Sequence, residues 1–227
     1  MTHAPVPGTP ALHMVVLAAG AARRLGEPKA LARLGSRTAL EHLLANWRAA
    51  GQPPESATVV LGADAERIAA KLPPSVAWLD NPAWAAGRTG TLQRAIRERP
   101  GADLMVAAVD TPLVSAGTLG SLIRAWRQAG SPPAGWLAPA TKSAALPAPR
   151  PGHPIVIGRE LLTAALDLDP DAPLRDLRGQ AGPLFLELVP DPAIHDDLDT
   201  PRDLARLRAR LEPGAGPSPG REMPGAS

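Results

Sequence analysis

Apolar runs of strand length alternate with amphipathic helical segments along most of this chain, and this alternation constrains the fold more than any other feature. After the first run, at 13–19, apolar residues return at the i, i+3, i+4, i+7 spacing of one helical face, from Leu40 to Trp47. Further strands are expected at 57–61, 76–79, 104–109, 135–138, 154–157 and 184–188, and further helices at 63–72, 91–99, 119–126, 159–166 and 201–211. Such alternation predicts a three-layer α/β fold, with helices on both faces of a mostly parallel sheet.

Three stretches depart from this pattern. Residues 1–12 are rich in proline and are expected to form a flexible lead, and the Pro, Gly and Ser composition of 212–227 predicts a disordered tail. One domain, 13–211, remains between them. Four prolines between Ala138 and Pro151 favour a mobile loop within that domain.

Composition excludes several classes of function. The chain has no cysteine, which removes disulfides, thiolate metal sites and cysteine nucleophiles. No apolar stretch is long enough for a membrane span, and Met1–Pro10 lacks the charged and apolar regions of a secretory signal, so a cytoplasmic protein is expected. The net charge is only +2, and the arginines form no basic cluster interleaved with aromatic residues, which argues against nucleic-acid binding.

A loop with two glycines and two cations follows the first expected strand. Its small residues allow a ligand to approach the backbone closely, and N–H groups there can point at phosphate oxygens. Arg24 and Lys29, the latter one of only three lysines, add positive charge. The spacing matches neither a Walker loop nor a dinucleotide fingerprint. The residues expected to contact a phosphate-bearing ligand are Leu17, Ala18, Ala19, Gly20, Arg24, Gly26 and Lys29.

The loop reads Leu-Ala-Ala-Gly, three residues, Arg, one residue, Gly, two residues, Lys. This spacing resembles the signature of nucleotidylyltransferases related to molybdopterin cytidylyl- and guanylyltransferases, and the resemblance extends from about Val15 to Leu211. It implies a Rossmann-like nucleotidyltransferase fold and transfer of a nucleotidyl group from a nucleoside triphosphate to a phosphorylated acceptor. Lys29, Arg24 and Asp110 would be the catalytic residues.

The segment Asn81–Leu92 resembles the family's Asn…Trp…Gly segment, which leads into a helix and contacts the base and ribose side of the nucleotide. The resemblance implies nucleotide contacts from Asn81, Gly87 and Thr91. Gly90 and Thr91 stand where relatives usually carry serines, and Thr91 is expected to cap the helix. A helix N-terminus also attracts anions. For Trp84, packing and ligand contact both remain open.

Three aspartates are candidate ligands of Mg²⁺. Asp110 follows the apolar run 104–109, and a carboxylate at the carboxyl end of a strand suits a metal beside phosphates. The family has a metal-binding Asp-x-Pro here, whereas the alternative is an Asp that caps the turn before Pro112. Asp197 and Asp199 share one side of an extended segment that resembles the family's Asp-Ile-Asp-Thr-Pro motif. Either would be the second metal carboxylate, and helix capping is the alternative.

The acceptor side rests on two weaker similarities. Gly152-His153-Pro154 resembles the family's Gly-His-Pro, so His153 would meet an acceptor phosphate or serve a structural role. Arg175 stands in a stretch that differs from the Gly-Asp-x-Gly-Ala-Arg of relatives. Guanylyl relatives usually have glycine at the position of Ala19, so CTP is the expected donor, with molybdopterin or molybdenum cofactor as acceptor and a molybdenum hydroxylase as a further partner. GTP, a sugar phosphate or other small phosphate, and a non-catalytic cofactor carrier for the hydroxylase are the alternatives.

Overall fold

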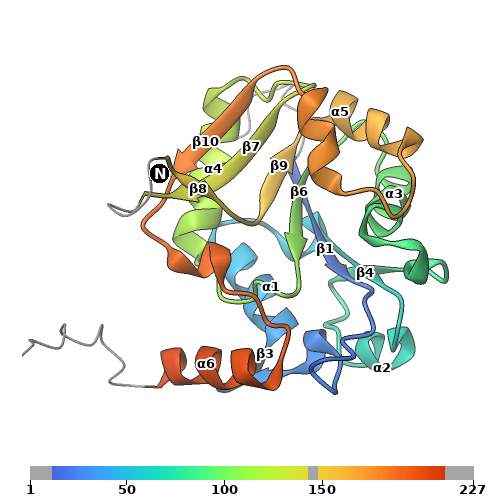
Figure 1. Cartoon of the computed structure of the whole chain (residues 1–227), viewed down its shortest axis with the longest axis vertical. Coiled ribbons are helices and arrows are strands. Elements are labelled where there is room, and N and C mark those ends of the chain that lie inside the picture. Colours follow the sequence, from blue (N-terminus) through green and yellow to red (C-terminus); the bar gives the residue numbers. More distant parts are fainter. Residues whose placement is uncertain (1–11, 143–147, 213–227) are drawn as a thin grey trace, which may run out of the picture.

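The computed structural model describes residues 12–142 and 148–212, which form three layers around one large sheet (Figure 1). The eight-stranded sheet has the order β10-β7-β9-β6-β1-β4-β5, and β8 pairs with β7. Only β8 and β9 run antiparallel to their neighbours. The strands are β1 (Leu12–Ala18), β4 (Ala57–Leu61), β5 (Ala77–Asp80), β6 (Asp103–Ala108), β7 (Trp136–Thr141), β8 (Arg150–Pro151), β9 (Ile155–Ile157) and β10 (Leu184–Leu188).

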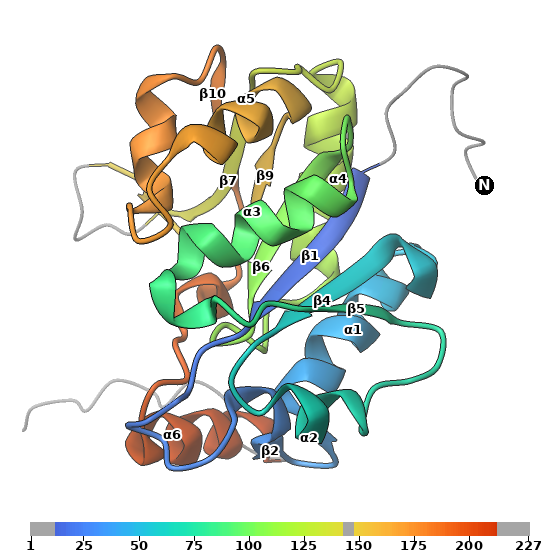
Figure 2. The ribbon, with the colours of Figure 1, turned by 90° about the vertical axis from the view of Figure 1, so that its right-hand side faces the viewer.

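Helices cover both faces of this sheet, with α3 and α5 on one face and α1 and α4 on the other (Figure 2). The side chains of β1 show why, because successive strand residues point to opposite faces. Met14 and Val16 pack in the core beneath α1 and α4, whereas Val15 and Leu17 pack in the core beneath α3 and α5. The helices are α1 (Ala39–Ala49), α2 (Ala65–Ala69), α3 (Arg88–Glu98), α4 (Ala116–Gln128), α5 (Arg159–Ala164) and α6 (Pro201–Leu211).

A third, smaller apolar cluster joins the loop after β1 to the C-terminal segment. Leu25 from that loop packs in it with Leu198, Leu204 and Leu207, the last two on α6. A hairpin of β2 (Arg33–Leu34) and β3 (Arg37–Thr38) adds Leu34, which is fully buried. This cluster brings residues near 25 and near 198 together, although they are far apart in the sequence.

The secondary structure agrees with the alternation for most elements and differs at identifiable places. The strands at 57–61 and 184–188 and the helix at 201–211 have the predicted bounds. The prediction of a mobile loop over 138–151 is wrong at both ends, because β7 continues to Thr141 and β8 occupies Arg150–Pro151. Pro151 is tolerated because β8 pairs with β7 alone and lies at the margin of the sheet. Residues 143–147 lie outside the described part.

The domain limits also differ in detail from those expected. Leu12, assigned to the lead, is the first residue of β1, while residues 1–11 and 213–227, for which a flexible lead and a disordered tail are expected, lie outside the described part. The helix expected from Thr91 begins earlier, at Arg88, with Gly87 as N-cap, so Thr91 does not cap it. Within 12–142 and 148–212, no helix has both the length and the apolar character needed to cross a bilayer.

Candidate active site

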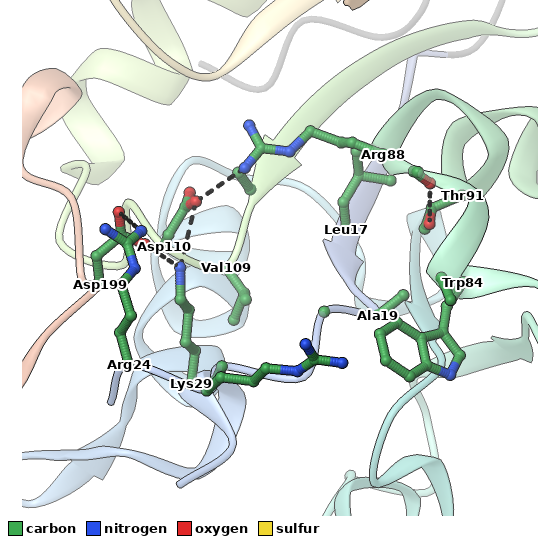
Figure 3. Close-up of a pocket in the computed structure, with 16 residues that line it drawn as sticks. Leu17, Ala19, Arg24, Lys29, Trp84, Arg88, Thr91, Val109, Asp110 and Asp199 are labelled. Carbon is green, nitrogen blue, oxygen red and sulfur yellow. Dashed lines mark hydrogen bonds and ion pairs between the residues drawn. The ribbon is translucent and has the colours of Figure 1, made fainter. Parts of the chain in front are cut away.

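Residues from the carboxyl ends of β1 and β6 and from the start of α3 line a cavity of about 420 Å³ (Figure 3). In open parallel sheets, ligands bind outside the carboxyl ends of the strands. Of the residues expected at a nucleotide site, those that line this cavity are Leu17, Ala19, Gly20, Arg24, Lys29, Gly87, Thr91, Asp110 and Asp199.

The loop after β1 is a tight turn that presents its cations to this cavity. The amides of Leu25 and Gly26 both donate to the carbonyl oxygen of Ala22, at 3.0 and 3.2 Å. Gly26 has a φ of 82°, a conformation that favours glycine. A Cβ on Gly20 would meet no described atom within 4 Å, because the space beside it belongs to the cavity. The backbone at Gly20 is therefore open to a ligand.

Lys29 lies between two of the predicted metal carboxylates. Its Nζ is 2.5 Å from Oδ1 of Asp199 and 3.6 Å from Oδ2 of Asp110. Arg24 donates to Asp199 at 2.8 Å. The side chains of Lys29 and Asp110 are only 18% and 14% exposed, so their charges interact in a partly desolvated setting. The structure thus brings together three residues expected to be catalytic, Arg24, Lys29 and Asp110.

Arg88, at the first position of α3, completes the cluster and was not predicted from the sequence. Its guanidinium donates to Oδ2 of Asp110 at 3.2 Å (Figure 3). The sequence feature that could have indicated Arg88 is its position directly after Gly87, in the segment expected to lead into a helix. Because the Asp110 carboxylate pairs with Lys29 and Arg88, its charge is directed to the cavity rather than to a turn amide.

The two aspartates near the C-terminus differ in their electrostatic environments. The hydrogen bond from Lys29 lowers the pKa of Asp199 below its ordinary value, burial opposes this shift, and the charges of Lys29 and Arg24 add to the lowering. Burial raises the pKa of Asp197, and the nearby carboxylates of Asp110 and Asp199 raise it further. Helix capping, the alternative role, is performed by Thr200 and Asp203. The charges of His153 and Lys29 oppose the rise at Asp197, and the two aspartates differ in the direction of their pKa shifts.

A second cavity of about 710 Å³ adjoins the first and shares four residues with it, Arg24, Arg88, Asp110 and Asp199. The predicted acceptor residues His153 and Arg175 line it, together with Asp197. Its lining also includes residues that were not predicted from the sequence, namely Arg150, Arg178 and His195. Of these three residues, Arg178 could have been predicted from the sequence, because it lies three residues after Arg175 and adds a second cation to the same stretch.

Burial lowers the pKa of His153 below its ordinary value, and Arg88 acts in the same direction. Asp110 and Asp197 oppose the shift. The backbone amide of His153 donates to the carbonyl oxygen of Ile194 at 3.0 Å, which fixes the histidine beside the C-terminal segment. His153 is therefore held in the second cavity with a pKa below its ordinary value.

Three residues expected at the nucleotide do not line the first cavity. Ala18 packs in the core beneath α1 and α4, and Gly26 lies in the turn that closes the loop. Asn81 is buried and donates to Oγ1 of Thr91 at 3.1 Å, and Thr91 in turn donates to the carbonyl oxygen of Gly87. Asn81 therefore supports the start of α3 from within, because its amide is used by the protein itself.

Trp84 both packs and lines the first cavity. A Cβ at Gly62, the residue after β4, would lie 2.4 Å from the Cβ of Trp84. The tryptophan therefore approaches the backbone more closely than any residue larger than glycine at position 62 would allow. Its ring lies across the cavity from Lys29 and beside Ala19 (Figure 3). Both roles considered for this residue are consistent with its position.

The carboxylates suit a Mg²⁺ ion that is bound jointly by the protein and by substrate phosphates, rather than by protein ligands alone. No group of three or more His, Cys, Asp or Glu residues close enough to hold a metal is found in the described ranges. Mg²⁺ is usually held by one or two carboxylates together with substrate phosphates and water. Asp110 with Asp199 or Asp197 meets that requirement beside a cavity lined by cations.

The cationic loop and the carboxylates at the carboxyl edge of the sheet are the arrangement expected of a nucleotidyltransferase. The family model described as "MobA-like NTP transferase domain" matches residues 14–184, and the chain belongs to this family. A search of curated protein sequences finds no match.

Solved structures agree with this assignment. A Mycobacterium sp. strain JC1 homolog of Rv0371c is 27% identical, with a TM-score of 0.70 over 88% of this chain and 98% of its own. A nucleotidyl transferase of Methanothermobacter thermautotrophicus is 25% identical, with a TM-score of 0.69 over 88% and 96%. The Rv0371c protein of Mycobacterium tuberculosis, in complex with manganese, is 24% identical, with a TM-score of 0.65 over 88% and 99%, and shows likeness of fold.

Proposed function

We propose that the protein transfers a cytidylyl group from CTP to the phosphate of molybdopterin or its molybdenum-bound form, with Mg²⁺, and releases pyrophosphate. The observation that carries this proposal is the meeting of the two cavities at Asp110, with Arg24, Arg88 and Asp199 lining both. A transferase must hold donor and acceptor so that their reacting phosphates face each other.

The reaction needs no covalent enzyme intermediate. A phosphate oxygen of the acceptor attacks the α-phosphorus of the triphosphate, a new P–O bond forms, and the bond to the leaving pyrophosphate breaks. Such transfers depend on positioning and on neutralisation of charge. Lys29, Arg24 and the open backbone at Gly20, which line the first cavity, would hold the triphosphate. Mg²⁺ held by Asp110 and Asp199 would neutralise charge on the phosphates.

The ion pairs of the cluster suit this exchange. Lys29 and Arg24 bind Asp199 at 2.5 and 2.8 Å, and Lys29 and Arg88 pair with Asp110 at 3.6 and 3.2 Å. Each of these charged groups therefore has a partner of opposite charge. A triphosphate would take the two cations while a divalent ion takes the carboxylates, and neither set would be left unpaired. The M. tuberculosis relative forms a complex with manganese, which supports a divalent ion here.

Donor and acceptor choice rest on different observations. Ala19 lines the first cavity, and the cytidylyl relatives that the loop resembles carry alanine at this position. Besides Arg24 and Arg88, which it shares with the first cavity, the second cavity has three arginines, Arg150, Arg175 and Arg178, and an apolar wall that includes Trp136 and Ile155. That lining suits an acceptor with a phosphate and a planar apolar body.

The test is pyrophosphate release with each of the four common nucleoside triphosphates and Mg²⁺, with and without molybdopterin. We expect release only with CTP and molybdopterin together. Turnover with GTP would overturn the base preference, and turnover only with a sugar phosphate as acceptor would overturn the acceptor. CTP binding with no pyrophosphate release under any condition would overturn the enzymatic proposal and favour a carrier.

A further inference from the structure

Residues 168–172, which precede Arg175, form a segment that is docked on the first turns of α3 by three hydrogen bonds. The amide of Gly90 donates to the carbonyl oxygen of Pro170 at 2.9 Å, and Oγ1 of Thr89 donates to that of Ala172 at 2.6 Å. One turn further along α3, Nε2 of Gln93 donates to the carbonyl oxygen of Leu168 at 2.8 Å. Thr89 and Gln93 are both buried, so these bonds are shielded from water.

Where the docked segment lies closest to the first turn of α3, there is no room for a side chain on the helix. A Cβ on Gly90 would lie 2.9 Å from Cβ of Pro170, and a Cβ on Gly87 would lie 2.3 Å from the carbonyl oxygen of Pro170. Gly90 stands where the family usually has a serine. A serine in this chain would push the docked segment away, so the glycine and the close approach of Pro170 belong together.

The docking links the start of α3, which lines the first cavity, to a turn that lines the second. On one side, Gly87, Arg88 and Thr91 of the α3 start line the first cavity. On the other, Ala172 leads directly into the 3-10 turn Leu174–Gly179, whose two arginines, Arg175 and Arg178, line the second. The turn itself is anchored by Leu177, which is fully buried.

We propose that Gly90 and Thr89 are positioning residues for the acceptor, because the contacts that they make with Pro170 and Ala172 set where Arg175 and Arg178 enter the second cavity. The two residues line neither cavity. The inference rests on the proposed function only in assigning the second cavity to the acceptor.

Gly90→Ala and Thr89→Val test the contact by independent routes. The first adds the clashing Cβ, and the second removes one hydrogen bond with little change of shape. Gly117→Ala is the matched control, because Gly117 also lies early in a helix, α4, and a Cβ there would meet only Ser115 Oγ at an ordinary 3.7 Å. Thermal unfolding of all three variants shows whether each is folded, and Thr89→Val keeps the test valid if Gly90→Ala is not.

Limited trypsin digestion measures the docking without any substrate, because trypsin cleaves after Arg175 and Arg178 when the segment opens locally. We expect both variants to be cut there severalfold faster than the wild type, with Gly117→Ala unchanged. Equal cutting of all four proteins would overturn the docking role.

Steady-state kinetics then measure the effect on the acceptor. We expect the KM for molybdopterin to rise about tenfold in both variants, since a small misplacement of binding groups weakens the productive complex. The KM for CTP should stay within about twofold of wild type, because the donor cavity is lined by other residues. Faster cutting with an unchanged KM for the acceptor would overturn the positioning role. If the wild type shows no turnover with molybdopterin, that result counts against the proposed acceptor alone.

Discussion

Nζ of Lys29 lies 2.5 Å from Oδ1 of Asp199, although 170 positions separate the two residues in the chain. Their meeting depends on the apolar cluster that packs Leu25, four residues before Lys29, against Leu198, one residue before Asp199. The amide of Leu198 also donates to the carbonyl oxygen of Asp110 at 2.7 Å, which ties the same segment to the end of β6. Three distant parts of the chain thereby meet at one point.

Lys29→Ala should lower turnover by about 100-fold or more, because it removes a cation placed to stabilise charge on the transferred phosphate. The fold should persist, since the lysine lies at the edge of a cavity. Initial rates of pyrophosphate release and thermal unfolding measure the two effects. Lys71→Ala, at an exposed position outside both cavities, is the matched control and should behave as wild type.

Asp199→Asn should reduce turnover more than Asp197→Asn. Asp199 lines both cavities and contacts Lys29, whereas Asp197 lines only the second. Titration of Mn²⁺ in the presence of a non-hydrolysable CTP analogue, followed by electron paramagnetic resonance, measures metal affinity beside the rates. A larger loss of affinity in Asp197→Asn would assign the second metal carboxylate to Asp197 instead.

Leu198→Ala should lower the free energy of unfolding by about 2 to 5 kcal/mol, the usual cost of truncating a buried leucine. Leu198 has no exposed surface and lies between the two aspartates, so turnover should fall as well. Urea denaturation measures the stability. Leu211→Ala, at a position 40% exposed on α6, should change it by only about 0.5 kcal/mol, and equal losses in the two variants would contradict this account.

Asp203 should stabilise α6 in a pH-dependent way. The hydrogen bond from Thr200 is the largest cause that lowers the pKa of Asp203 to about 2 from its ordinary 3.8. Because the pKa is lower in the folded protein, the stabilisation is fully present above about pH 3.8 and is lost as the pH falls towards 2. Asp203→Asn should therefore destabilise the protein at pH 6, and the difference from wild type should shrink between pH 4 and 2. A difference that is constant over this range would contradict the assigned pKa.

Much of the fold could be predicted from the sequence because its signals are local. The periods of apolar residues indicated the strands and helices, and Thr200, Pro201 and Asp203 marked the start of α6. The failures occurred where tertiary contacts override local preference. Prolines near 139 and 151 suggested a loop, yet pairing with the sheet holds these residues in β7 and β8.

The candidate site shows the same division. The loop spacing predicted Arg24 and Lys29, which line the first cavity, because both belong to one continuous motif. Arg88 was missed because its importance lies in its distance to Asp110, and nothing in the local sequence specifies that distance. Likewise, the reason for glycine at position 90 became visible only with Pro170 packed above it.

In the proposed mechanism, Asp110, where the two cavities meet, supports transfer from CTP to molybdopterin. The most direct measurement is the rate of pyrophosphate release from these two substrates with Mg²⁺, for the wild type and for Asp110→Asn. We predict release by the wild type only when both substrates are present, and a rate at least about 100-fold lower for a correctly folded Asp110→Asn. Equal rates for the two proteins would contradict it.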